Sequence, residues 1–209
     1  MAYGHFPLLN FCRFSSDIYF PIEFDPDEQI VNLTIRTLIL NATTAKELNS
    51  LFDILPKLYN LEATLENEIG KLTTIHTSLE HLCLTFRNSA EHFENILLRT
   101  PHLKQLRLNG KIEDSSVLIF FEKLARFIHV NMLQLEIFNC ELFSDAWDPR
   151  AEILAIHQLH PLFKSVVRHR GDFMSDCYAT DLTEYPIGSK YSCEFKKGFD
   201  EKINFILFL

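Results

Sequence analysis

Two histidines in the last third of the chain are spaced as metal ligands would be on a helix. His157 and His160 lie three residues apart and would share one helix face, where they would offer two nitrogens to a metal ion. No third or fourth ligand follows at a matching spacing, and Pro161 ends the helix. We therefore predict no metal site and read the two as ordinary histidines at a helix end.

A thiol and an imidazole stand two residues apart at Cys83 and His81. On a strand both side chains point to the same face, and a cysteine nucleophile needs a positioned base of this kind. The pair is thin evidence for catalysis, and two neighbouring surface side chains are the simpler interpretation. The sequence has no phosphate-binding or hydrolase motif and only six glycines. We predict that the protein is not an enzyme and uses no cofactor.

A short basic run surrounds His169, with Arg168 and Arg170 beside it and Lys164 nearby. Such a run would suit a phosphate or an acidic partner, and a solvated strand or turn is the alternative interpretation. The formal net charge of the whole chain is −8, which disfavours nucleic acid and anionic membranes as general partners.

The elements that would position these residues follow from a repeated pattern. Leu79-x-x-Leu82-x-Leu84 recurs as Leu103-x-x-Leu106-x-Leu108, and a helix-like run separates the two copies. Three further copies are Ile35-x-x-Leu38-x-Leu40, Leu58-x-x-Leu61-x-Ala63 and Met132-x-x-Leu135-x-Ile137. The first positions of successive copies are 21 to 29 residues apart. Each copy predicts a short strand whose second and third apolar residues point inward.

Helices are predicted between these strands, because parallel strands need a crossover. Apolar spacing predicts a helix over 45–55, capped by Thr43 or Thr44 and stopped by Pro56. Further helices are expected over 68–76, around Phe93 with Ala90, Ile96 and Leu97, over 114–128 with a cap at Asp114 or Ser115, and over 150–159. The predicted fold class is α/β, a short curved solenoid of parallel strands and crossover helices with an irregular C-terminal flank.

The spacing and the apolar positions of residues 33–143 resemble a leucine-rich-repeat protein, most closely the F-box-associated and ribonuclease-inhibitor-like intracellular types. Cys140 matches the asparagine or cysteine that this family places three residues after the last strand leucine. The resemblance implies a non-catalytic binding scaffold. Members joined to an F-box act as substrate adaptors of ubiquitin ligases, so a substrate-recognition fragment of such an adaptor is an alternative function.

We divide the chain into three parts. Residues 1–32 form an N-terminal cap or a decayed repeat at Leu8-x-x-Phe11, residues 33–143 form the repeat region, and residues 144–209 form a C-terminal cap or small subdomain. In the last part, Leu162-x-x-Ser165-x-Val167 has the spacing of a failed sixth repeat. After the polar stretch 172–190, Tyr191–Phe195 and Lys202–Leu209 are expected to pair as strands.

The residues between the inward leucines would line the concave side of the coil, and these we expect to bind another protein. They are Asn60, Glu62, His81, Cys83, Gln105, Arg107, Gln134, Glu136 and Phe138. Arg107 is the expected centre, because its planar fork can make two directed hydrogen bonds. The alternatives are that this face is only solvated, or that Arg107 pairs with Glu136. An enzyme site in the flank, around His157, His160 and Arg168, is a further alternative.

Cysteine usage and the two ends predict the compartment. Five cysteines without a C-x-x-C pair favour reduced thiols in an intracellular protein. The N-terminus lacks the pattern of a signal peptide, and the apolar run Ile203–Leu209 is far shorter than a membrane span. We therefore expect a cytoplasmic or nuclear protein without membrane contact, and its oligomeric state stays open.

Overall fold

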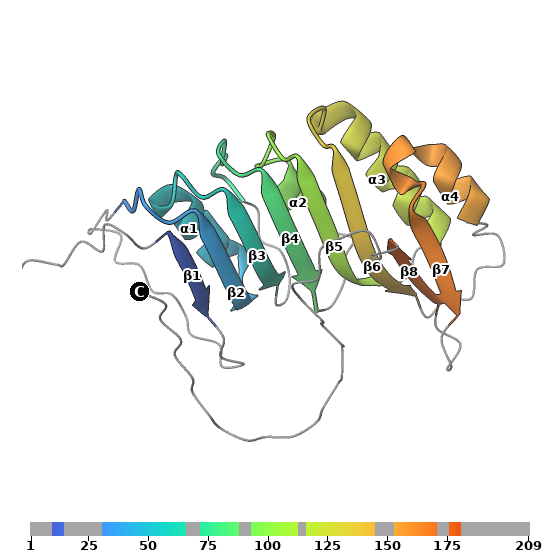
Figure 1. Ribbon diagram of the computed structural model, residues 1–209, viewed down its shortest axis with the longest axis horizontal. Coiled ribbons are helices and arrows are strands. Elements are labelled where there is room, and N and C mark those ends of the chain that lie inside the picture. Colours follow the sequence, from blue (N-terminus) through green and yellow to red (C-terminus); the bar gives the residue numbers. More distant parts are fainter. Residues whose placement is uncertain are drawn as a thin grey trace, which may run out of the picture.

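The computed structural model of the chain describes residues 10–14, 31–65, 72–87, 93–112, 116–144, 153–170 and 176–180. Its strands form one eight-stranded sheet, and its helices lie together on one face of that sheet (Figure 1). The strands are β1 Phe11–Phe14, β2 Thr37–Thr43, β3 Asn60–Leu65, β4 His81–Phe86, β5 Gln105–Ile112, β6 Ile137–Ser144, β7 Val166–Arg170 and β8 Asp176–Thr180. The helices are α1 Ala45–Ile54, α2 Phe93–Leu97, α3 Val117–Asn131, α4 Ile153–Leu159 and the 3-10 helix η2 Pro161–Phe163.

The sheet is mostly parallel, which confirms the predicted α/β class. Strands β1 to β6 pair in chain order, each parallel to the next, and the order continues with β8 and then β7. Parallel neighbours need a crossover, and α1, α2 and α3 provide it after β2, β4 and β5. Among the described residues, no helix is long and apolar enough to cross a membrane.

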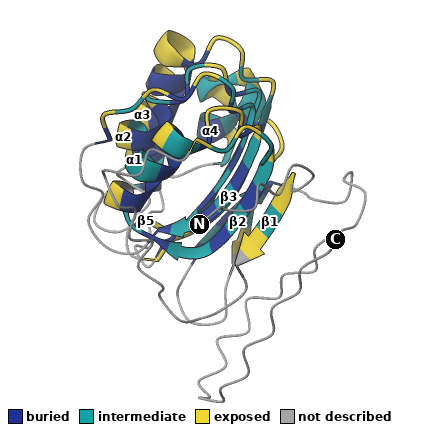
Figure 2. Cartoon of the chain, turned by 90° about the vertical axis from the view of Figure 1, so that its left-hand side faces the viewer, coloured by how far each residue is buried: buried dark blue, intermediate teal, exposed yellow. Residues whose placement is uncertain are grey.

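Alternate residues of each strand point into the layer between sheet and helices. Leu61, Leu82, Leu106 and Phe138 stand opposite one another on neighbouring strands, and each is almost fully buried. Ala63, Leu84, Leu108 and Cys140 form the next buried row. The buried residues therefore form a continuous layer beneath the helices (Figure 2). Each strand and the crossover that follows it contribute one set of buried residues to this layer, and the packing of neighbouring sets forms the core.

Helix α1 begins where the sequence predicts. The Thr44 hydroxyl accepts a hydrogen bond from the Glu47 N–H at 3.3 Å, and a Glu47 carboxylate oxygen accepts one from the Thr44 N–H at 2.7 Å. This reciprocal pair is a capping box, and of the two predicted caps it selects Thr44. The helix ends at Ile54, two residues before Pro56, as expected.

Helix α3 lies three residues later than predicted and has the predicted length. It spans Val117–Asn131, and its N-cap residue Ser116 makes no side-chain capping bond. The predicted caps Asp114 and Ser115 lie outside the described residues. The helix is held by its apolar stripe: the Phe120 ring lies 5.6 Å from the Phe93 ring of α2, and the Phe121 ring lies 5.2 Å from that of Phe163.

The helix predicted over 68–76 is wrong for residues 72–76, the part of it that the structure describes. Residues 72–76 have no helical structure, and residues 66–71 lie outside the described residues. The backbone of His76 instead donates to the Arg99 carbonyl at 2.7 Å, and its ring Nε2 lies 2.8 Å from the Leu55 carbonyl oxygen. These hydrogen bonds connect the segment to the residues that follow α1 and α2.

The strand predicted from Met132-x-x-Leu135-x-Ile137 is wrong by three residues. Helix α3 continues to Asn131, and Met132 is its C-cap, with its N–H bonded to the Ile128 carbonyl. Strand β6 starts only at Ile137, and Phe138 and Cys140 take the inward positions opposite Leu106 and Leu108. Met132 is apolar because it belongs to the end of the helix. The predicted pattern took it for the first apolar position of the strand and therefore began three residues too early.

The N-terminal segment, predicted as a cap or a decayed repeat, contains a strand, but the register differs by one residue from that of the proposed repeat. Strand β1 pairs with β2 so that Cys12 stands opposite the buried Leu38. Arg13 stands opposite Ile39, which belongs to the other face of the sheet. The expected pattern put Phe11 and Arg13 at the inward positions, so its register is corrected while the strand itself is confirmed.

The C-terminal flank adds two strands to the same sheet. Strand β8 inserts antiparallel between β6 and β7, and its Tyr178 is fully buried. The failed repeat at Leu162-x-x-Ser165-x-Val167 is therefore wrong, because Leu162 lies in the 3-10 helix and β7 has no parallel neighbour among the described strands. The predicted strands Tyr191–Phe195 and Lys202–Leu209 lie outside the described residues.

Candidate functional site

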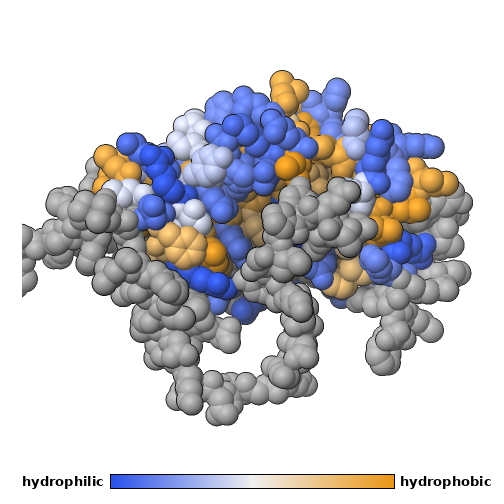
Figure 3. Space-filling view, in the orientation of Figure 1, coloured by the Kyte–Doolittle hydropathy of each residue, from blue (hydrophilic) through white to orange (hydrophobic). Residues whose placement is uncertain are grey.

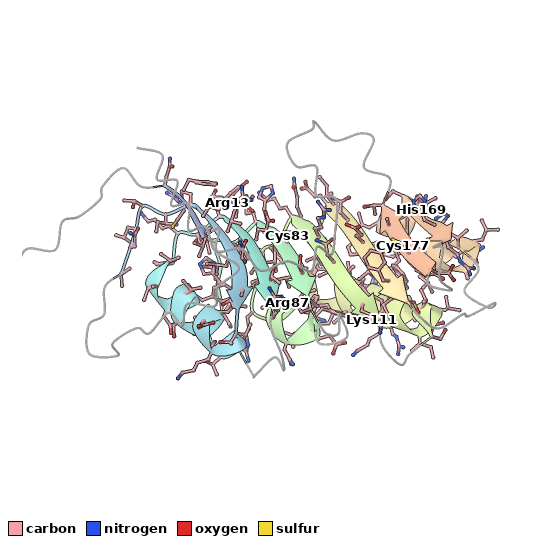
Figure 4. The ribbon with its side chains drawn as sticks, turned by 90° about the horizontal axis from the view of Figure 1, so that it is seen from below. Arg13, Cys83, Arg87, Lys111, His169 and Cys177 are labelled. Carbon is pink, nitrogen blue, oxygen red and sulfur yellow. The ribbon has the colours of Figure 1, made fainter. Side chains whose placement is uncertain are left out.

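The helices lie on one face of the sheet, and we call the face turned away from them the open face (Figure 1). No helix of the described residues covers it (Figures 1 and 2). Side chains reach it from the positions between the buried ones, and in Figure 4 Cys83 and Cys177 lie on this side of the sheet. Because the strands are in register, these side chains form rows across the strands.

Three rows make up the central part of the open face. The first contains Thr37, Asn60, His81, Gln105 and Ile137. The second contains Ile39, Glu62, Cys83, Arg107 and Asn139. The third contains Thr64, Thr85, Asn109, Glu141 and Ala179. All of these residues are half-buried, so each shares its surface between its neighbours and solvent.

Arg107 lies in the second row between Cys83 and Asn139 and is held in place by two neighbours. Its Nε donates to the Asn109 Oδ1 at 3.2 Å, and its guanidinium lies 3.8 Å from the Glu141 carboxylate. The Asn109 amide in turn donates to the Thr85 hydroxyl at 3.3 Å. The alternative in which Arg107 pairs with Glu136 is wrong in its partner, and Glu141 of β6 takes that role because β6 lies in a different register. These contacts pre-orient the Arg107 fork toward the third row.

His81 belongs to a second network at the edge where the strands begin. Its Nε2 lies 3.0 Å from the Tyr59 hydroxyl, and the two rings are 4.8 Å apart. Beside them, the Lys104 ammonium and the Glu80 carboxylate are 2.6 Å apart. Hydrogen bonding to Lys104 lowers the pKa of Glu80. Tyr59 is 41% exposed, so this network presents an ordered aromatic ring beside the open face.

The surroundings of Cys83 together raise the pKa of its thiol. Burial, followed by the negative charge of Glu62, raises this pKa to about 11, although Arg107 and the Asn109 amide act in the opposite direction. The imidazole of His81 is engaged with Tyr59. The thiol therefore stays protonated near neutral pH, and the two residues share a face without forming a nucleophile–base pair.

Three of the predicted face residues lie elsewhere, and the register of β6 is the reason. Phe138 is only 3% exposed and points into the core. Gln134 lies in the turn before β6, and Glu136 lies just before that strand. Ile137, Asn139 and Glu141 occupy the open face in their place. The apolar stripe of α3, continued one turn past Ile128 to Met132, is the sequence signal that would have corrected the register.

The histidines of the flank each hold a separate backbone partner. The His157 Nε2 lies 2.7 Å from the Val166 carbonyl oxygen, and the His160 Nδ1 accepts the Leu162 N–H at 3.3 Å. Arg168 forms an ion pair with Asp176 and stacks near Tyr178. Within the described ranges, no group of three or more His, Cys, Asp or Glu side chains is placed to hold a metal ion.

Comparison with known proteins identifies no homologue and no structural neighbour. No protein-family model, curated protein or solved structure matches the chain. The arguments for function therefore rest on the geometry of the open face itself.

The open face carries two kinds of polar side chain, those with partners among the described residues and those without. Asn60, Glu62 and Gln105 form no side-chain hydrogen bond or ion pair with described residues. Beside them, Arg107, Asn109 and His81 are held in fixed orientations. The face thus combines pre-oriented groups with polar groups whose hydrogen-bonding capacity is left for solvent or a ligand.

Proposed function

We propose that the chain is a short leucine-rich-repeat solenoid that acts as a non-catalytic protein-interaction module and binds a partner protein on its open face. The observation that carries this proposal is the row structure of that face. Half-buried polar side chains of adjacent strands stand side by side, over a buried layer that holds the strands rigidly. A rigid scaffold with ordered side chains loses little conformational entropy when a partner binds.

The repeated strand–crossover unit supports the solenoid part of the proposal. Its strands stack in parallel at a constant register, with one buried row of leucines after another. A stack of this kind has a long face without helices, where a partner can contact several units together.

The centre of the proposed interface is Arg107, with Glu62 and Cys83 beside it in the same row. Arginine is frequent at energetic centres of interfaces, because its guanidinium makes directed hydrogen bonds while its stem packs. Asn60, His81 and Gln105 form the neighbouring row. With the register of β6 corrected, Ile137, Asn139 and Glu141 complete the interface in place of Gln134, Glu136 and Phe138.

A comparison of two variants tests the proposal on a partner recovered by affinity capture and then purified. Arg107→Ala removes the centre of the open face, and Glu94→Ala removes a carboxylate on the helix layer that pairs with Lys123 at 3.8 Å. We expect Arg107→Ala to weaken binding by more than about 1 kcal/mol while Glu94→Ala leaves it unchanged. Thermal unfolding checks that both variants stay folded. Equal and negligible effects would show that the open face is not the interface.

A further inference from the structure

Two parts of the open face differ in chemistry. At β3 the face carries Glu62 with the amide of Asn60 on the same strand, and the edge beyond it is formed by β2 and by β1 with Phe11 and Arg13. Toward β8 and β7 it carries an apolar group that we call the apolar end, made of Phe143, Ala179 and Val167. Phe143 and Val167 are 36% and 39% exposed, and Figure 3 shows apolar side chains at the surface at the β7 end of the molecule.

Glu62 is a carboxylate without a counter-ion among the described residues. Its neighbours across the strands are Ile39 on one side and Cys83 on the other, and neither can neutralise it. Burial and then the charge of Glu62 raise the pKa of the neighbouring Cys83 thiol. A half-buried carboxylate in such surroundings favours the approach of a cationic group that brings hydrogen-bond donors.

Arg107 does not take this role, although it lies only two strands away. It is turned toward the other end of the face, where Asn109 and Glu141 hold it. The Arg107–Glu141 ion pair therefore lies between Glu62 and the apolar end, and its two charges neutralise each other. A ligand can contact Glu62 on one side of this ion pair and the apolar end on the other.

The distance between these two anchor points follows from the sheet. From β3 to β8 there are four strand-to-strand steps in the order β3-β4-β5-β6-β8. At about 4.8 Å a step, Glu62 and Ala179 are roughly 20 Å apart across the face. An extended chain advances about 3.3 Å per residue, so about six residues bridge this distance.

We propose that the open face binds an extended segment of another protein that runs across the strands. This segment places an arginine or lysine against Glu62 and an apolar side chain on the apolar end, about six residues away. The inference rests on the proposed interaction function and names the chemistry of the partner. The formal net charge of −8 acts in the same direction, because it attracts basic segments over a distance.

The test is a titration of the full chain with synthetic peptides, followed through its backbone amide signals by NMR. Each peptide has a serine–threonine background with one arginine and one phenylalanine–leucine pair, and the two are separated by three, six or nine residues. We expect the six-residue spacing to bind most tightly and to shift amides of both β3 and β8. Replacing arginine by neutral citrulline should weaken that peptide about fivefold, as for a single partly exposed charge pair.

Three variants show whether the proposed contacts are responsible. Glu62→Gln should abolish the preference for arginine over citrulline, while Glu122→Gln on α3 keeps it as a charge-matched control. Phe143→Ser should abolish the preference for the six-residue spacing. Each variant is first checked for an unchanged unfolding midpoint, since all three positions are at least partly exposed.

The possible outcomes separate this inference from the proposed function. If peptides shift open-face amides but ignore spacing and Glu62, the partner chemistry is wrong and the open face stands as the interface. If the shifts fall on α1 to α3 instead, both proposals fail. If no peptide shifts any amide at about 2 mM, a concentration that detects very weak binding, the basic–apolar segment is overturned.

Discussion

Leu106 of β5 stands directly opposite Phe138 of β6, and both side chains are buried beneath α3 and its neighbours. This pairing sets the register of the last parallel strand and thereby decides which residues of 134–141 reach the open face. The same slice of core contains the Phe163 ring, 5.2 Å from that of Phe138.

Phe138→Ala should therefore destabilise the fold strongly, by about 3–5 kcal/mol, because it leaves a cavity in a packed layer. Chemical denaturation measures this change in the free energy of unfolding. Glu136→Ala, two residues earlier and exposed, is the matched control and should change it by less than about 0.5 kcal/mol. Similar effects of the two substitutions would contradict the register described here.

Thr44→Ala should weaken α1, because it removes the hydroxyl that accepts the Glu47 N–H. The expected loss in unfolding free energy is about 0.5–2 kcal/mol, the range for N-cap residues. Ser50→Ala serves as the control, since the Ser50 hydroxyl only bonds back to the Lys46 carbonyl within the helix. A loss no larger than that of Ser50→Ala would mean that the capping box contributes little.

His76 should make the protein less stable as the pH falls. Burial lowers the pKa of its ring below the ordinary value of 6.5, while the bond to the Leu55 carbonyl acts in the opposite direction. The neutral ring is thus favoured in the folded state, so its contribution is present above about pH 6.5 and is lost as the pH falls through the lowered folded pKa.

Denaturation of the protein between pH 8 and pH 5 measures this loss. His76→Gln, which keeps a polar side chain but does not titrate, should show a smaller decrease over the same interval. If both proteins lose stability in parallel, other groups are responsible for the pH dependence.

Asp176→Asn should destabilise the packing of β8 between β6 and β7. Asp176 is 4% exposed and forms an ion pair with Arg168 on the neighbouring strand, and the variant removes the charge of this buried carboxylate. We expect a loss of about 3 kcal/mol, at the lower end for a broken buried pair because Arg168 is partly exposed. Asp53→Asn on the exposed side of α1 is the charge-matched control, and thermal unfolding of both variants decides the comparison.

The periodic elements could be predicted from the sequence because their signals are local. The apolar spacing of 45–55 and the threonine before it predict α1, and the two central copies of the leucine pattern predict β4 and β5 with their inward residues. The alternation in β3, β4 and β5 also places six predicted residues on one face, namely Asn60, Glu62, His81, Cys83, Gln105 and Arg107. Alternation within a strand determines this result without reference to distant parts of the chain.

Where an element begins was decided by tertiary packing. Met132 fits both the last turn of a helix and the first position of a strand, and only the pairing of Phe138 with Leu106 selects between them. Strand β8 lies in a polar stretch, and its sequence shows no alternation of apolar residues. Its inward positions include the polar residues Asp176 and Thr180, which can be buried because Arg168 and Asn139 on other strands pair with them. Likewise, Arg107 acquires its orientation from Glu141, a partner 34 positions along the chain that the sheet register alone brings within 3.8 Å. Local periodicity specifies which side of an element is apolar, whereas contacts between distant residues specify register and partners, because their energies depend on the assembled sheet.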